Sequence, residues 1–124
     1  MAKAKIMIVD DDLDIRLLLG HRLKGEDYQA VFASDAISAV SMVRKEEPDL
    51  ILLDLGLPAG NGYIVMNRIK SMPGLSHIPI IIVTARDVRA EHDQVMHAGA
   101  DAIFQKPFEY EELLAAIKSA LGEG

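Results

Sequence analysis

The chain contains five short apolar runs, and each of them ends at a polar side chain. The runs occupy residues 6–9, 29–33, 51–54, 80–83 and 102–105. Short continuous runs of this kind, several of them rich in isoleucine and valine, are typical of strands buried on both faces in a parallel sheet covered by helices. The pattern therefore predicts five buried strands.

The segments between these runs carry apolar residues at helical spacing. We expect core-facing stripes at Ile15, Leu18, Leu19 and Leu23, at Ile37, Val40 and Val43, at Met66 and Ile69, and at Tyr110, Leu113, Leu114, Ile117 and Leu121. Ser34 is positioned to cap the second helix, and Gly25 to end the first. Five-fold alternation of strand and helix predicts an α/β fold: a doubly wound, five-stranded parallel sheet flanked by five helices, in a single domain over residues 1–124.

The weakest of the predicted helices covers residues 87–97. Its apolar stripe holds only Val88, Val95 and Met96, and His92 lies on the same face. A helix that buries little apolar surface is held loosely. We therefore expect this segment to move more easily than the other helices.

Composition narrows the class of protein. A chain of 124 residues is long enough for one core without cross-links, and without cysteine it has no disulfide, thiol nucleophile or cysteine-ligated zinc. The net charge of −6 argues against broad nucleic-acid binding. No apolar run approaches the ~20 residues of a membrane span, and no signal-peptide pattern precedes the first run. We expect a soluble cytoplasmic domain that binds neither nucleic acid nor membrane.

The polar residues at the strand ends include a group of acids. Carboxyl ends of parallel strands share one edge of the sheet, so we expect Asp10, Asp11 and Asp54 to meet there, with Thr84 and Lys106 beside them. Neighbouring carboxylates repel by roughly 4 kcal/mol per pair at about 4 Å and an effective dielectric constant near 20, so the group requires a cation. Mg²⁺ suits carboxylate oxygens and keeps water ligands that a phosphorylated substrate can replace. With Mg²⁺ and the lysine the site is neutral and can accept a dianionic phosphoryl group.

Each of these residues also has an ordinary structural explanation when it is taken alone. The acids at positions 10–12 can cap the first helix and complement its dipole, and we expect Asp12 to do so. Asp54 can be a turn residue, Thr84 a strand residue and Lys106 a solvated charge. Their joint placement at four strand ends is what points to a site.

These features together resemble the receiver domain of bacterial two-component response regulators, such as the chemotaxis regulators. The resemblance extends from about Lys5 to Leu121, and its motifs in chain order are Asp10-Asp11, Asp54, Leu57-Pro58 with Gly62-Tyr63, Thr84-Ala85 and Lys106-Pro107-Phe108. It implies a flavodoxin-like sheet with strand order 2-1-3-4-5. It also implies a phosphorelay protein of signal transduction, a switch that catalyses only its own phosphorylation and dephosphorylation and is not otherwise an enzyme.

The resemblance implies a role for each site residue. Asp54 would be the phosphoacceptor, taking a phosphoryl group from a histidine kinase or phosphotransfer protein to form an acyl phosphate. Lys106 would pair with Asp54 and then with the phosphoryl oxygens, while Thr84 would move its hydroxyl onto the phosphoryl group. The bond before Pro107 would be cis. The implied ligands of Mg²⁺ are Asp11, Asp54 and the backbone carbonyl of Gly56, with Asp10 acting mainly through water.

The chain departs from the family pattern three residues before Lys106, where many receivers carry tyrosine or phenylalanine and this chain carries Ile103. An aromatic ring that turns inward therefore cannot transmit the conformational change. We expect movement of the backbone at Thr84-Ala85 and repacking of the fourth helix to transmit it instead. By resemblance, a downstream protein target or output domain would dock on the face of the fourth helix, fifth strand and fifth helix. Gly56 and Arg86 occupy positions that tune acyl-phosphate lifetime in this family.

Two other functions remain open on the sequence. The chain could be a receiver-like binding module that is never phosphorylated, although such modules usually lose an acid, the hydroxyl residue or the lysine, and this chain keeps them all. It could also be an aspartate-nucleophile phosphatase of the haloacid-dehalogenase type with Asp10 as nucleophile, although Asp14 stands where that family has threonine or valine. An EF-hand is excluded because Ile15 replaces its required glycine and His21 its bidentate glutamate.

Overall fold

The computed structural model describes residues 3–123 and contains five strands that alternate with five helices. In chain order they are β1 Lys5–Val9, α1 Leu13–Gly25, β2 Gln29–Ala33, α2 Ala36–Glu46, β3 Leu50–Leu53, α3 Gly62–Lys70, β4 Ile80–Thr84, α4 Val88–His97, β5 Ala102–Gln105 and α5 Tyr110–Ala120. The predicted alternation is confirmed, with strand bounds within one residue of the apolar runs. No helix within residues 3–123 is both long and apolar enough to cross a membrane.

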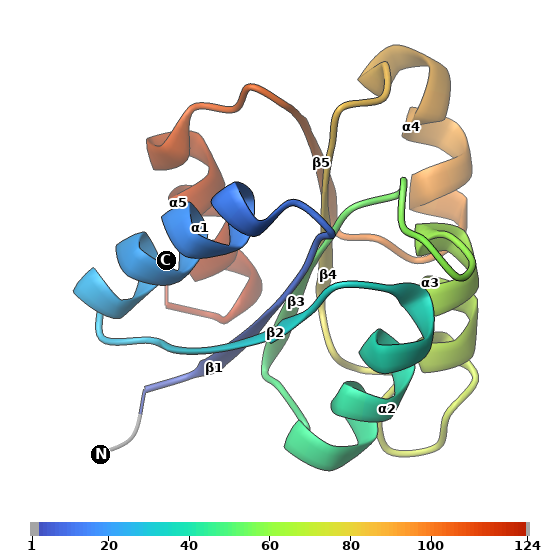
Figure 1. Ribbon diagram of the computed structural model, residues 1–124, viewed down its shortest axis with the longest axis horizontal. Helices are drawn as coiled ribbons and strands as arrows, with labels where there is room; N and C mark the ends of the chain where they lie inside the picture. The colour runs from blue at the N-terminus through green and yellow to red at the C-terminus, as the bar shows by residue number, and fades with distance from the viewer. Residues whose placement is uncertain (1–2, 124) are drawn as a thin grey trace.

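All five strands are parallel, in the order β2-β1-β3-β4-β5 (Figure 1). This confirms the doubly wound sheet and the strand order that the resemblance implied. The order reverses between β1 and β3, where Met7 lies beside both Val31 and Ile51. Ligands of open α/β sheets bind at such a reversal, beyond the carboxyl ends of the strands.

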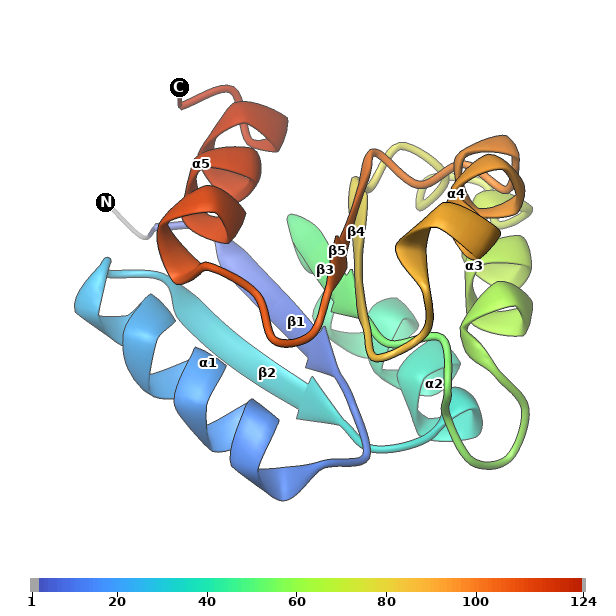
Figure 2. The ribbon, with the colours of Figure 1, turned by 90° about the horizontal axis from the view of Figure 1, so that it is seen from above.

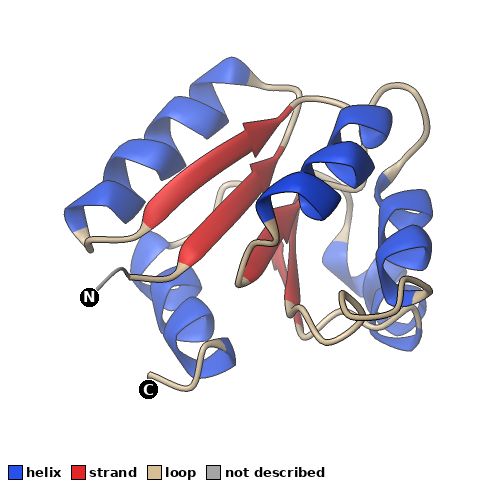
Figure 3. Cartoon of the chain, turned by 90° about the horizontal axis from the view of Figure 1, so that it is seen from below, coloured by secondary structure: helices blue, strands red, loops and turns tan. Residues whose placement is uncertain are grey.

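The helices cover the sheet on both faces. Figure 2 shows α1 and α5 on one side of the strands and α2, α3 and α4 on the other, and Figure 3 shows the strands as the layer between them. Each face has its own core, one centred on Leu19, Leu23, Leu113 and Ile117 and the other on Val43, Val65, Met66 and Ile69. β3 separates the two cores, and its four residues are at most 1% exposed. Burial on both faces explains why its sequence is apolar without alternation.

The structure corrects one predicted helix boundary and confirms another. Asp35, not Ser34, caps α2: its backbone is extended, and its carboxylate accepts a hydrogen bond of 2.7 Å from the Ser38 N–H. Ser34 lies one residue too early to reach that group. α1 does end at Gly25, but the left-handed residue that turns the chain is Asp27, with φ of 67°. Asp12 caps α1 as expected.

The core-facing stripe predicted for α2 is correct at Val43 but wrong at Ile37. The buried residues are Ala36, Ala39 and Val43, whereas Ile37 is 72% exposed. The two alanines occupy the positions i and i+3 that face the sheet, and their small side chains let the helix lie close to it. Ile37 consequently lies on a different side of α2 from Val43. On α1, Leu18 is likewise 48% exposed.

α4 buries little apolar surface, as expected. Val95 is its one buried residue, and Met96 is 38% exposed. His92 and His97 are exposed. The helix is capped by Asp87, whose carboxylate accepts from the Arg89 N–H at 3.0 Å.

Candidate functional site

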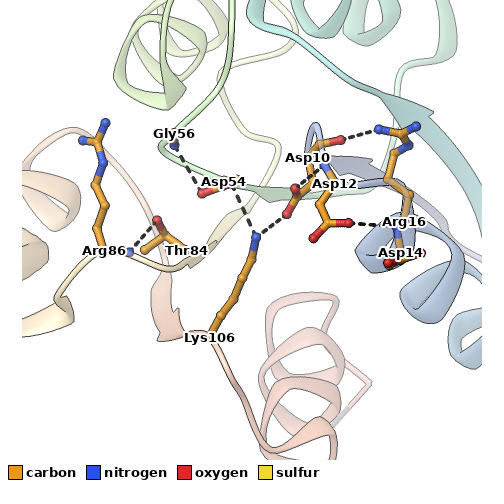
Figure 4. A network of polar contacts seen from close by, with 9 residues as sticks. All are labelled: Asp10, Asp12, Asp14, Arg16, Asp54, Gly56, Thr84, Arg86 and Lys106. Atoms are coloured by element: carbon orange, nitrogen blue, oxygen red, sulfur yellow. Dashed lines mark hydrogen bonds and ion pairs between the residues drawn. The ribbon is translucent and has the colours of Figure 1, made fainter.

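The first two acids of the site are placed by the backbone of neighbouring strands. Asp10 follows β1, and its N–H donates to Ala33 O at 3.1 Å; Asp54 follows β3, and its N–H donates to Val9 O at 3.0 Å. Each aspartate therefore continues the ladder by one residue beyond its strand. The side chains emerge together at the edge of the sheet (Figure 4).

Asp10, Asp11 and Asp54 form a cluster whose carboxylate oxygens lie within 4.8 Å of one another. Asp10 is 3% exposed and Asp54 is 8% exposed, while Asp11 is exposed. The cluster is therefore buried at Asp10 and Asp54 and open to solvent at Asp11. A donor set of carboxylate oxygens that retains access to water fits a hard divalent cation such as Mg²⁺.

Lys106 brings a positive charge to the two buried acids. Its Nζ donates to Asp10 Oδ2 at 2.6 Å and lies 3.4 Å from Asp54 Oδ2, so it contacts both acids and lies closer to Asp10 (Figure 4). The expected pairing with Asp54 is present, but it is the longer of the two contacts. The Lys106 N–H donates to Thr84 O at 2.8 Å, and the Lys106–Pro107 bond is cis, as expected.

The ionisation of this pair follows from burial and proximity. Burial raises the pKa of the Asp10 carboxyl, while the hydrogen bonds from Lys106 and the Asp12 N–H oppose that rise only in part. Burial acts to lower the pKa of Lys106, but the hydrogen bond to Asp10 and the negative charge of Asp54 outweigh it, so that pKa is raised. The lysine therefore stays protonated between the acids at neutral pH.

Thr84 and Gly56 complete the set of residues named from the sequence. Thr84 ends β4 and is 1% exposed, and its Oγ1 accepts from the Arg86 N–H at 3.2 Å. The Gly56 N–H donates to Asp54 Oδ1 at 3.2 Å. One oxygen of Asp54 is thus held by the backbone that follows it, and the other faces Lys106.

Arg16 also belongs to the site, although it was not among the residues expected there. Its Nη1 donates to the backbone carbonyl of Asp10 at 2.7 Å, and the Asp12 N–H donates to Asp10 Oδ1 at 2.9 Å (Figure 4). Both contacts fix the first acid from the start of α1. Arg16 lies one turn beyond the cap at Asp12, but an arginine in the first turn of a helix is not distinctive, so the sequence offered no signal.

A second group of contacts joins the loop after β4 to two helices. Arg86 Nη1 donates to Glu91 Oε1 at 3.2 Å, and Tyr63 Oη donates to Glu91 Oε2 at 2.8 Å. Burial, together with the hydrogen bond to Glu91, raises the pKa of Tyr63 to about 12. Glu91 on α4 therefore bridges α3 and the residues that follow Thr84.

Comparison with known proteins places this geometry in one family. The model of the response regulator receiver domain matches residues 6–118. The transcriptional regulatory protein YxdJ of Bacillus subtilis is 43% identical over 119 residues, which cover 94% of this chain and 50% of that protein. The sporulation initiation phosphotransferase F of the same organism is 36% identical over 121 residues, which cover 98% of this chain and 96% of that protein. The chain thus spans half the length of the first relative and nearly all of the second.

Solved structures agree with the sequence comparison. A response-regulator structure from Chloroflexus aurantiacus has a TM-score of 0.89 at 32% identity, covering 96% of this chain and 98% of that one. The receiver domain of the sensor histidine kinase PA1611 from Pseudomonas aeruginosa also has a TM-score of 0.89, at 26% identity and with 98% and 99% covered, and it holds a magnesium ion in its active-site cleft. The strand order, the acids at the strand ends and these relatives lead to one conclusion: the chain belongs to the receiver domains of two-component response regulators.

Proposed function

We propose that this receiver accepts a phosphoryl group on Asp54 from a phosphohistidine of a sensor kinase or phosphotransfer protein, in a Mg²⁺-dependent reaction. Phosphorylation then alters the conformation of a surface on which a downstream protein target or output domain docks. Residues 1–124 act as one receiver domain in the cytoplasm, and the chemistry is limited to its own phosphorylation and dephosphorylation. The observation that carries the proposal is the buried contact of Lys106 with both Asp10 and Asp54 beside an open acidic cluster.

The residues supply what phosphoryl transfer requires, which is mostly positioning and neutralisation of charge. The Asp54 carboxylate is a nucleophile at neutral pH without a base: its oxygen bonds to phosphorus as the phosphorus–nitrogen bond of the phosphohistidine breaks. The departing imidazole keeps the electron pair and takes up a proton. Lys106 offsets negative charge on the phosphoryl oxygens, because it already lies between the two acids.

The acidic cluster is suited to the metal that this reaction needs. Asp10, Asp11 and Asp54 would hold Mg²⁺, with the backbone carbonyl of Gly56 as a further ligand and Asp10 acting mainly through water. When bound, the ion draws charge from the phosphoryl oxygens and aligns them with the attacking carboxylate. The magnesium-bound relative from Pseudomonas aeruginosa supports this assignment.

The contacts of Thr84 suggest how modification is transmitted. Its hydroxyl oxygen accepts from the Arg86 N–H, and that hydroxyl would donate to a phosphoryl oxygen on Asp54 by moving towards it and away from the Arg86 N–H. Losing this contact frees the loop whose Arg86 side chain holds Glu91 of α4. A change of about one unit of charge at Asp54 thereby shifts the conformational equilibrium of α4, a helix whose one buried residue is Val95.

The surface beside the site supports a protein as the donor of the phosphoryl group. Leu13, which follows directly after the acids, and Leu17, one turn further along α1, are 56% and 60% exposed. Exposed apolar side chains grouped at a site indicate a contact surface for another protein. A partner that presents its histidine to Asp54 would cover them.

The proposal is tested by the intact mass of the protein after incubation with Mg²⁺ and acetyl phosphate, beside the variant Asp54→Asn. We expect a gain of one phosphoryl group that hydroxylamine removes, and none in the variant or with EDTA. If the folded protein gains no phosphoryl group under any condition, it is a phosphorylation-independent binding module. If the adduct still forms in Asp54→Asn, the nucleophile is another residue. Asp10 would then be the candidate nucleophile, as in an aspartate-nucleophile phosphatase.

A further inference from the structure

A groove of about 570 Å³ runs along the outer side of α2, where this helix meets α3. The two helices lie side by side on the same face of the sheet, away from α1 and α5 (Figures 1 and 2). Six larger side chains line the groove: Ile37, Val40, Arg44 and Lys45 from α2, and Ile64 and Arg68 from α3. None of them belongs to the phosphorylation site.

The apolar part of the groove is not needed for the core. Ile37 is 72% exposed and Ile64 is 49% exposed, whereas α2 contacts the sheet through Ala36, Ala39 and Val43. At its start the helix therefore presents alanines to the protein and Ile37 to solvent. Two exposed isoleucines that line one groove are typical of a surface that another molecule covers.

The cationic part of the groove has no partner among residues 3–123. Among residues 3–123, the ion pairs and side-chain hydrogen bonds leave out the side chains of Arg44, Lys45 and Arg68. No acidic residue lines the groove. Basic residues in the last turn of a helix also complement the helix dipole. That role does not explain why the cations of two helices line the same groove. In a chain with a net charge of −6, three such cations indicate an acidic ligand.

The order of the lining residues gives the groove a direction. Both helices follow parallel strands and run the same way, so Ile37 and Ile64 lie near their starts and Arg44 and Arg68 near their ends. Along α2, the lining positions from Ile37 to Lys45 span about 12 Å, at about 1.5 Å per residue. That length suits two to three turns of another helix, with an apolar face at one end and acidic groups at the other.

We propose that the α2–α3 groove docks an acidic amphipathic helix of a partner protein. Its apolar side chains pack on Ile37, Val40 and Ile64, and its carboxylates pair with the three cations. An amphipathic helix in a groove is a common mode of peptide recognition. The site is separate from Asp54 and would allow a second protein to bind while the phosphorylation site is occupied.

The test uses a synthetic amphipathic peptide of about 15 residues, the length at which an isolated helix begins to be stable. It carries leucines on one face and four glutamates towards one end, and the control peptide has the same composition in scrambled order. Binding is measured by fluorescence anisotropy, and the contact is mapped by amide chemical shifts in NMR spectra. We expect saturable binding of the first peptide only, with shifts confined to α2, α3 and the loop between β3 and α3.

Variants of the protein separate the groove from general electrostatics. Arg44→Gln with Arg68→Gln should weaken binding at least ten-fold, and Ile37→Ser should weaken it as well. The matched control, Lys24→Gln with Arg89→Gln, removes the same charge from exposed positions outside the groove and should leave binding within two-fold. Asp54→Asn should bind as the unmodified protein does, so the result does not depend on the phosphorylation proposal.

Several outcomes would overturn the inference. They are equal binding of the scrambled peptide, equal weakening by the two double variants, shifts on another face, or no binding at millimolar peptide. Binding of anionic vesicles or single-stranded DNA that Arg44→Gln with Arg68→Gln abolishes, without peptide binding, would assign the groove to a membrane or nucleic acid instead. Self-association that Ile37→Ser abolishes would assign it to a second copy of the chain.

Discussion

Lys106 holds together a site that carries excess negative charge. Asp10 and Asp54 are both buried, and the lysine is the cation that contacts each of them, at 2.6 and 3.4 Å. Removing one member of a buried ion pair leaves a charge without compensation, which is more costly than the pair itself is stabilising. The lysine therefore has a structural role before any phosphoryl group arrives.

We expect Lys106→Met to destabilise the metal-free protein by on the order of 3 kcal/mol, because two buried acids lose their common cation. Mg²⁺ should recover part of this loss, so its addition should raise the thermal midpoint more in the variant than in the unmodified protein. Both quantities are obtained from denaturation followed by circular dichroism, with EDTA or with Mg²⁺.

The matched control is Lys118→Met, since Lys118 pairs with Glu26 at 3.8 Å at the surface. Exposed pairs contribute up to about 1 kcal/mol. Equal stability of the two lysine variants would contradict the structural role of Lys106.

At the scale of elements, the start of α3 is tied to the loop that carries Asp54. Gly62 opens α3, and its N–H donates to Leu55 O at 2.9 Å. A Cβ at this position would lie 2.6 Å from Asp54 O and 2.8 Å from Leu55 Cα, which are backbone atoms and cannot turn aside. The glycine is required by close approach and not by an unusual φ.

Gly62→Ala should therefore displace the backbone at Asp54. We expect a loss of stability of about 1–3 kcal/mol, as for an overpacked core position, and slower phosphorylation by acetyl phosphate. Urea denaturation and the rate of mass gain measure the two effects.

Gly25→Ala serves as the control, because nothing lies within 4 Å of a Cβ added there. Alanine is the better helix former, so this variant should be as stable as the unmodified protein or more stable by up to about 1 kcal/mol. If Gly62→Ala matched it in stability and rate, the close approach at Asp54 would not constrain the site.

At the scale of the whole molecule, α4 combines the least burial with a direct connection to the site. Val95 is its one buried residue, and Glu91 joins it to Arg86 and Tyr63. Local opening costs least where few apolar contacts are broken. Ile103, which is partly buried against the core of this face, has no ring that could report the switch.

Hydrogen exchange should show this arrangement directly. We expect amides of α4 to exchange faster than those of α1, α3 and α5, and we expect phosphorylation with Mg²⁺ and acetyl phosphate to change exchange most at residues 87–97. Strong protection of α4 in the resting protein, or identical exchange there after phosphorylation, would show that the response is carried by another element. Asp54→Asn treated in the same way is the control.

The fold class, the five strands and the edge of the sheet at which the acids gather could all be predicted from the amino-acid sequence. Uninterrupted apolar runs identify strands buried on both faces, and parallel strands bring the residues that follow them to one edge, so Asp10, Asp54, Thr84 and Lys106 could be placed before any coordinates. The strand order came from the family resemblance, because periodicity does not distinguish which strands pair.

Which side of each helix faces the core, and which partner each polar group takes, became known from the folded structure alone. For α2, Ile37 and Val40 have the same i, i+3 spacing as Ala36 and Ala39, and which pair faces the sheet depends on how closely the helix approaches it. The closer contact of Lys106 with Asp10, and the arginine that holds the Asp10 carbonyl, depend on distances between segments far apart in the chain. Residue type and spacing specify what a side chain can bind, and the packing of the elements decides which of those groups it reaches.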